Sequence, residues 1–222
     1  MLLETIEKET ATDPQWTVIW LHGLGADGND FAPIVPELVR KHWPAIRFVF
    51  PHAPVRAVTI NGGARMRAWY DIVGMDLGSR ADTAGVAESI AQVQALIDRE
   101  TERGIAPERI VLAGFSQGGA ITLSYGLRAP QPLAGLVALS TYLPDPDNAA
   151  NRLQAGAQVQ PVFFAHGSAD PVVPMALGEQ SMAAMRQLGF SVQSHRYPMA
   201  HQVCAEEIRD LGDWLEQRLS AG

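Results

Sequence analysis

The chain has 222 residues and a net charge of −7, and 47% of its residues are hydrophobic while 18% are charged. This length supports one sizeable core, and the composition is that of a globular protein rather than a disordered or fibrous one. The acidic balance, with its basic residues scattered, argues against the basic surface that nucleic-acid binding requires, so no nucleic-acid partner is expected.

The N-terminal residues indicate neither export nor membrane insertion. The stretch "MLLETIEKETATDPQW" lacks the basic region and apolar run of a signal peptide. The longest apolar runs, such as "TVIWL", are too short to span a bilayer, and a single cysteine, Cys204, cannot form an internal disulfide. We therefore expect a cytoplasmic protein without a stable membrane anchor. The apolar stripe that includes Cys204 predicts a place in the core for its side chain.

Short runs of β-forming residues alternate with helical patterns along the chain. The runs are "TVIWL", "IRFVF", "RIVLA", "AGLVALS", "VFFAH" and "SVQSHRY". Apolar periodicity predicts helices over about 82–104, 175–188 and 202–219, and a helix of small residues after "GFSQG". This alternation predicts an α/β fold with a mainly parallel central sheet flanked by helices, in one domain over residues 1–222.

One segment, from about residue 51 to 80, has glycine and proline but no sustained period, so we predict an irregular loop there. Long irregular connections in compact domains tend to be functional. We therefore expect this loop near the active site. It carries Trp69 and Tyr70, which either anchor the core or line a pocket.

The strongest chemical signal is Gly114-Phe115-Ser116-Gln117-Gly118, a G-x-S-x-G motif. It stands between a β-rich run and a helix of small residues, which is the setting of a nucleophile elbow. The flanking glycines leave room for a strained turn that exposes the serine. The N–H of Gln117, at the helix N-terminus, faces a developing negative charge. Ser116 is therefore predicted to be a nucleophile, and the alternative is a serine in a structural turn.

A serine hydroxyl needs a base to become a good nucleophile, and the base needs an orienting carboxylate. In this kind of fold the three residues follow one another as serine, acid and histidine. His166 and His195 fall in predicted strands, whereas His201 follows "YPMA" in a loop just before the last helix. His201 is therefore the preferred base.

Asp170 is the preferred acid, because it follows the run "VFFAH" at the carboxyl edge of a parallel sheet. An aspartate before a proline is also common in ordinary turns. Asp145 and Asp147, which follow the preceding strand in "PDPDN", are the reserve candidates.

A second glycine motif, at residues 23–28, reads "GLGADG" and matches the dinucleotide-binding pattern. That function would require an acidic residue about twenty positions later, and "IRFVFPH" offers none. Pro33 and Pro36 also disfavour a helix that begins within the motif. A hydrolase needs a second N–H opposite that of Gln117, which the loop after an early strand supplies. We therefore predict that the N–H of Leu24 binds the oxyanion.

The sequence resembles the carboxylesterase and acyl-protein thioesterase family of α/β-hydrolases in six motifs, which follow the family's order over nearly the whole chain. They are "LHGLGADGNDF", "WYDI", "GFSQGGA", "LSTYLP", "HGSADPVVP" and "AHQVCAEEI". The resemblance implies a triad of Ser116, Asp170 and His201. It also implies oxyanion donors at Leu24 and Gln117, and it implies neither a cofactor nor a metal.

The same resemblance implies that Tyr142 and Val172 line the substrate pocket, and Trp69 is the third predicted substrate-binding residue. It suggests a homodimer, since dimers are common among similar proteins. No cysteine stands near the N-terminus, so lipid anchoring is not expected. The short chain leaves no room for a large cap domain.

We therefore expect a serine hydrolase that cleaves carboxylic esters of small to medium acyl chains through an acyl-enzyme. The alternative is an acyl-protein thioesterase or lysophospholipase that acts on long acyl chains. A hydrolase-fold binding protein without catalysis is disfavoured because all three triad residue types stand in the right order. A nucleotide-dependent oxidoreductase is disfavoured because its acidic residue is missing.

Overall fold

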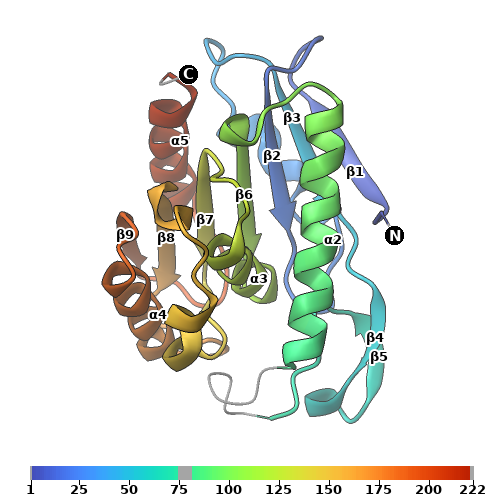
Figure 1. The fold of residues 1–222 in the computed structure, drawn as a ribbon, viewed down its shortest axis with the longest axis vertical. Helices are drawn as coiled ribbons and strands as arrows, with labels where there is room; N and C mark the ends of the chain where they lie inside the picture. Colours follow the sequence, from blue (N-terminus) through green and yellow to red (C-terminus); the bar gives the residue numbers. More distant parts are fainter. Residues whose placement is uncertain (1, 75–81, 221–222) are drawn as a thin grey trace.

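A seven-stranded sheet forms the centre of the computed structural model, which describes residues 2–74 and 82–220 (Figure 1). Its strands are Thr5–Glu9 (β1), Trp16–Leu21 (β2), Ile46–Pro51 (β3), Ile110–Phe115 (β6), Gly135–Leu139 (β7), Val162–Gly167 (β8) and Val192–Tyr197 (β9). They lie in the order β1-β3-β2-β6-β7-β8-β9, and all neighbouring pairs are parallel except β1 with β3. The predicted mainly parallel sheet is confirmed.

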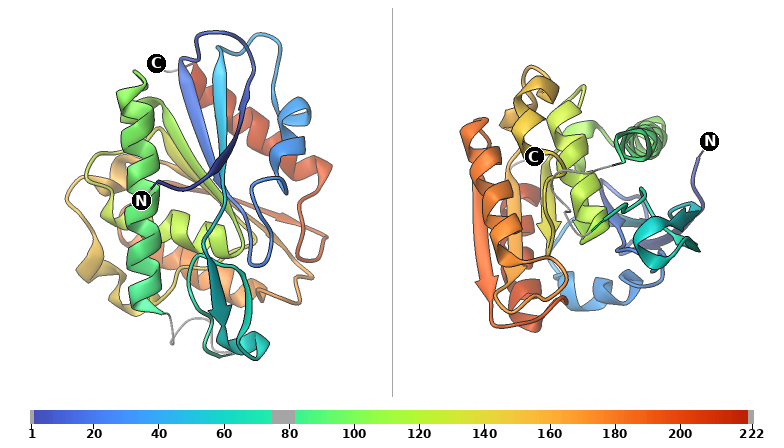
Figure 2. Two further views of the ribbon diagram at one scale, coloured as in Figure 1. Left: turned by 90° about the vertical axis from the view of Figure 1, so that its right-hand side faces the viewer. Right: turned by 90° about the horizontal axis from the view of Figure 1, so that it is seen from below.

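Helices cover both faces of this sheet, as the two views of Figure 2 show. They are Val35–Leu38 (α1), Thr83–Glu102 (α2), Gln117–Arg128 (α3), Met175–Gln187 (α4) and Ala205–Leu219 (α5). Helices α2, α3 and α4 contribute to one core cluster, whereas α1 and α5 contribute to the other. Cys204, predicted to lie in the core, is partly buried against the second cluster. Within residues 2–74 and 82–220, no helix combines the length and apolarity needed to cross a membrane.

Burial on both faces explains why the central strands are apolar along their whole length. In β2 all six residues are buried, and alternate side chains enter opposite cores. Ile19 and Leu21 belong to the cluster under α2 and α3, whereas Val18 and Trp20 belong to the cluster under α5. This is the pattern that a parallel sheet between two helical layers imposes.

The segment predicted to be irregular between about 51 and 80 contains a hairpin, so that expectation is wrong in part. Val55–Val58 (β4) pairs with Ala64–Arg67 (β5), and both lie at the end of the sheet toward which the arrows of β2 and β6 point (Figure 1). The strands have only four residues each, and seven of their eight residues are exposed or only partly buried, so their sequences show no clear apolar–polar alternation that would reveal them. Residues 75–81 of the same segment lie outside the described residues.

Candidate active site

Ser116 occupies the sharp turn between β6 and α3. Its φ of 54° and ψ of −119° are strained for a residue with a side chain. A Cβ atom on Gly118 would lie 2.4 Å from the carbonyl oxygen of Leu21, and one on Gly114 would lie 2.4 Å from the backbone of Gly118. Both flanking positions therefore require glycine, and the predicted strand, turn and helix around the motif are confirmed.

The structure brings Ser116, His201 and Asp170 into one hydrogen-bonded chain. The Oγ of Ser116 lies 2.9 Å from Nε2 of His201, and Nδ1 of His201 lies 2.7 Å from Oδ2 of Asp170. Because a carboxylate only accepts, Nδ1 carries the ring proton, and Nε2 is left to accept from the serine hydroxyl. The imidazole is therefore placed to take the proton of Ser116.

The loop after β8 fixes the carboxylate of Asp170. Its Oδ1 accepts hydrogen bonds from the N–H groups of Val172 and Val173, at 2.8 and 2.9 Å. Buried His166 donates from Nε2 to the carbonyl of Val173 at 2.8 Å. Burial lowers the pKa of His166, so this ring stays neutral. The remaining carboxylate oxygen of Asp170 is free to face His201.

The other candidate residues have different partners. Asp145 forms an ion pair with Arg152, and Asp147 is exposed in the turn that follows. His195 lies in β9 as predicted, with its Nδ1 3.3 Å from Oδ2 of Asp210. Of the candidate acids and bases, the described hydrogen bonds connect Asp170 and His201 with the serine.

Leu24 and Gln117, the two predicted oxyanion donors, border the same cavity as Ser116. Gln117 is the first residue of α3, so its N–H has no partner within the helix. Among the backbone hydrogen bonds of the described residues, neither N–H is a donor. Both are therefore available to a substrate oxygen.

His22 holds the loop that carries Leu24. Its Nδ1 donates to the carbonyl of Gly23 at 2.7 Å, and its Nε2 accepts from the N–H of Ala53 at 3.0 Å. Burial lowers the pKa of His22 to about 4, which keeps Nε2 unprotonated and able to accept. The loop is followed by a single 3₁₀ turn, Ala32–Ile34 (η1), and by the four-residue α1, so no long helix begins at the glycine motif.

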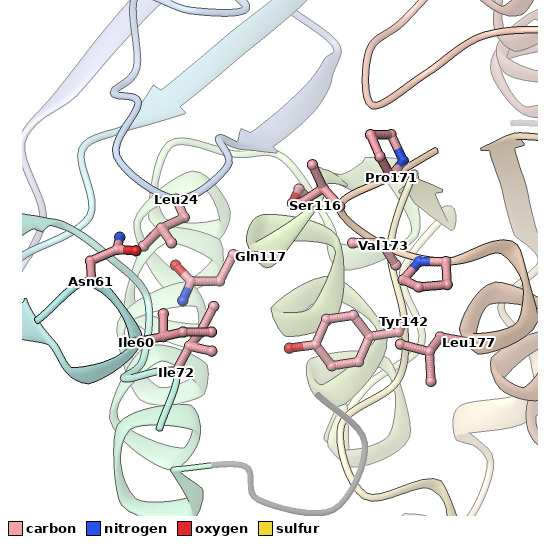
Figure 3. A pocket seen from close by; sticks show the side chains of 12 residues that line it. Leu24, Ile60, Asn61, Ile72, Ser116, Gln117, Tyr142, Pro171, Val173 and Leu177 are labelled. Atoms are coloured by element: carbon pink, nitrogen blue, oxygen red, sulfur yellow. The ribbon is translucent and has the colours of Figure 1, made fainter. Parts of the chain in front are cut away.

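An apolar cavity of about 380 Å³ opens beside Ser116 (Figure 3). Its walls include Leu24, Ile60, Ile72, Tyr142, Val172 and Leu177. Tyr142 and Val172 were predicted to line it. Ile60 and Ile72 were missed because they belong to the segment around the β4–β5 hairpin. Leu177 lies in the helix predicted over about 175–188, in which no pocket residue was singled out.

Trp69 is not among the residues that line this cavity. Its side chain is completely buried, and its indole N–H donates to the carbonyl of His22 at 2.8 Å. The neighbouring Tyr70 places its hydroxyl 2.7 Å from that of Tyr142, and burial raises the pKa of both phenols. Of the two roles open to Trp69, the geometry therefore supports the core anchor.

The side chain of Gln117 connects the segment at Trp69 to the start of α3. Its Oε1 accepts from the N–H of Trp69 at 2.8 Å, and its Nε2 donates to the carbonyl of Tyr70 at 2.7 Å. Both bonds are buried. They hold the segment that leads to Ile72 against the turn that carries Ser116.

Gln117→Ala is expected to lower the free energy of unfolding by about 2–4 kcal/mol, because it leaves two buried backbone groups unpaired. The value of kcat should fall by no more than about tenfold, since the backbone N–H that is predicted to face the oxyanion remains. Urea unfolding and hydrolysis of p-nitrophenyl butyrate measure the two effects. A loss of kcat as large as that of Ser116→Ala, in a variant that is still folded, would assign the amide itself to the chemistry.

Comparison with known proteins gives one consistent result. A protein-family model described as Phospholipase/Carboxylesterase matches residues 4–219. The chain is 38% identical to acyl-protein thioesterase 1 of Neurospora crassa, over 99% of this chain and 91% of that protein. It is 37% identical to a probable carboxylesterase of Oryza sativa subsp. japonica, over 92% of this chain and 78% of that protein. The solved structure of Zea mays acyl-protein thioesterase 2 matches with a TM-score of 0.84 and 29% identity, over 97% of this chain and 99% of that one.

Proposed function

The chain belongs to the phospholipase/carboxylesterase family of α/β-hydrolases, and from this premise we propose that it is a serine esterase whose catalytic residues are Ser116, His201 and Asp170. The observation that carries the proposal is the pair of hydrogen bonds, 2.9 and 2.7 Å long, that connects these three side chains. A serine in an unrelated turn would need neither of them. The strained backbone at Ser116 is the second support.

In the proposed reaction Ser116 attacks the carbonyl carbon of an ester or thioester while His201 takes its proton. The carboxylate of Asp170 stabilises the imidazolium that forms. The N–H groups of Leu24 and Gln117 bind the tetrahedral oxyanion, and each contributes about 3 kcal/mol to transition-state stabilisation. His201 then protonates the leaving group, and water cleaves the acyl-enzyme by the same steps.

We propose esters of small to medium acyl chains as substrates. The cavity beside Ser116 has a volume of about 380 Å³, which is near the lower end of the range for ligand pockets. Its apolar side chains suit an acyl chain, and buried Tyr142 borders it. This size favours a short chain that ends inside the protein.

A long-chain thioesterase or lysophospholipase is the second candidate, and the rim of the cavity favours it. Val172 and Ile60 border the cavity and are 56% and 37% exposed. A longer chain could continue over these apolar side chains toward solvent. The names of the relatives from Neurospora crassa and Zea mays point in the same direction.

Hydrolysis of p-nitrophenyl esters from two to sixteen carbons tests both candidates, with Ser116→Ala as the blank. We expect kcat/KM to be highest at short to medium chains and to decrease beyond them. A maximum at the longest chains would transfer the proposal to the second candidate. The absence of any hydrolysis that depends on Ser116 would overturn the esterase proposal itself.

A further inference from the structure

A second cavity, of about 440 Å³, borders His201, whereas the first cavity borders Ser116. Its walls come from residues 30–37, which follow the loop of Leu24, and from residues 201–208, around the start of α5. Oγ of Ser116 and Nε2 of His201 are 2.9 Å apart, so each member of the proposed reacting pair borders one of the two cavities. The acyl chain accounts for only one of them.

Within the proposed reaction, on which this inference rests, the bond between the carbonyl carbon and the leaving oxygen or sulfur breaks. The leaving atom takes the proton held on Nε2 of His201, so the leaving group departs with an OH or SH group rather than as an alkoxide or thiolate. The leaving group therefore lies beside His201 while the acyl chain lies beside Ser116. We propose that the second cavity binds the leaving group, and that it selects alcohols and thiols that carry a positive charge over neutral and anionic ones.

The composition of the second cavity supports this selection. The rings of Phe31 and Phe115 border it, and the ring centroid of Phe115 lies 4.8 Å from that of His201. The carboxylates of Asp30 and Glu37 border it as well and are exposed, and its described lining residues include no lysine or arginine. Carboxylates attract an ammonium ion by charge, and aromatic rings beside them give apolar contact to its carbon substituents.

Among residues 2–74 and 82–220, no ion pair involves Asp30 or Glu37, the two carboxylates beside this cavity. Although the side chain of Asp30 is exposed, partial desolvation by its neighbours and then the charge of Asp27 raise its pKa, which is the direction for a carboxylate without a cation beside it. Arg40 follows the same segment, but its guanidinium forms ion pairs with Asp213 and Glu216 of α5. The cavity therefore attracts a cationic leaving group and repels an anionic one.

Three thioesters that share the butyryl group and differ in the charge of the leaving thiol test the proposal. Butyrylthiocholine carries a quaternary ammonium, S-(3,3-dimethylbutyl) thiobutyrate has carbon in place of that nitrogen, and 3-(butyrylthio)propanesulfonate is anionic. Hydrolysis is followed by the loss of thioester absorbance, because a thiol reagent could also label Cys204, which borders the cavity. The measured quantity is the ratio of kcat/KM for the cationic substrate to that for the neutral one.

The double variant Asp30→Asn/Glu37→Gln is expected to lower this ratio by about fivefold and to raise the anionic-to-neutral ratio by a similar factor. Differences in intrinsic reactivity between the thioesters cancel in this comparison of proteins. The control is Glu102→Gln/Glu108→Gln, which removes the same charge from exposed positions that line neither cavity. Its ratios should equal those of the unsubstituted protein. Sodium chloride at 0.5 M should lower the cationic-to-neutral ratio of the unsubstituted protein and of the Glu102/Glu108 variant, but not that of the Asp30/Glu37 variant.

An unchanged ratio in the Asp30/Glu37 variant overturns the charge selection, and so does an equal decrease in the Glu102/Glu108 variant, which would indicate an effect of overall charge. In both cases hydrolysis of the neutral thioester that depends on Ser116 shows that the esterase proposal stands. If no substrate is hydrolysed in a manner that depends on Ser116, the esterase proposal fails and this inference fails with it.

Discussion

Replacement of His201 by alanine is expected to lower kcat by about 10⁶-fold, which is the scale of loss when the base of a serine triad is removed. The reason is geometric, because Nε2 of His201 accepts from the hydroxyl of Ser116 at 2.9 Å and no other described histidine bonds to that hydroxyl. Without this nitrogen the serine must lose its proton to water. The measurement is single-turnover acylation by p-nitrophenyl butyrate, which isolates the step that His201 is proposed to assist.

His195→Ala is the matched control for this prediction. His195 pairs with Asp210, and its ring stacks against Phe163 at a centroid distance of 5.0 Å, so its removal affects packing in β9 and not the proton transfer. We expect a modest loss of stability and acylation within about twofold of the unsubstituted protein. If His195→Ala abolished acylation while His201→Ala retained it, the assignment of the base would be reversed.

The sheet and much of the site could be predicted because their signals are local. Strands buried on both faces read as unbroken apolar runs, and "RIVLA" and "VFFAH" became β6 and β8. The helix expected over 82–104 is Thr83–Glu102. The turn at Ser116 could be predicted because a strained turn requires glycine on either side, and His201 could be placed in the loop before the last helix, whereas the catalytic roles of both stay predictions.

Other features could not be predicted because they depend on partners that are distant in the chain. Strand β1 reads "TIEKE" and is held by its antiparallel pairing with β3, about forty residues away. The apolar character of Trp69 does not distinguish a core residue from a pocket wall. Its hydrogen bond to His22 distinguishes them, and so does the bond from its backbone to Gln117. The cavity beside Ser116 depends in the same way on Ile60, which lies in the turn between β4 and β5.

Asp170→Asn is expected to lower kcat by about 10⁴-fold while the protein stays folded. The N–H groups of Val172 and Val173 both donate to Oδ1, so the amide oxygen of the asparagine must take that place. Its NH₂ group then faces Nδ1 of His201, where Oδ2 now accepts at 2.7 Å. An NH₂ donor there favours the imidazole tautomer with the proton on Nε2, which can no longer accept from Ser116.

Asp145→Asn is the matched control for this second variant, because it makes the same chemical change in the reserve acid. Asp145 has a φ of 52°, a conformation that asparagine tolerates, and its carboxylate pairs with Arg152 rather than with a histidine. We expect a kcat within about twofold of that of the unsubstituted protein, measured with p-nitrophenyl butyrate. Thermal unfolding of both variants shows whether they are folded. A near-normal rate for Asp170→Asn would remove Asp170 from the triad and transfer its role to Asp145 or Asp147. A 10⁴-fold loss confined to Asp170→Asn would mean that the carboxylate acts through the tautomer of His201.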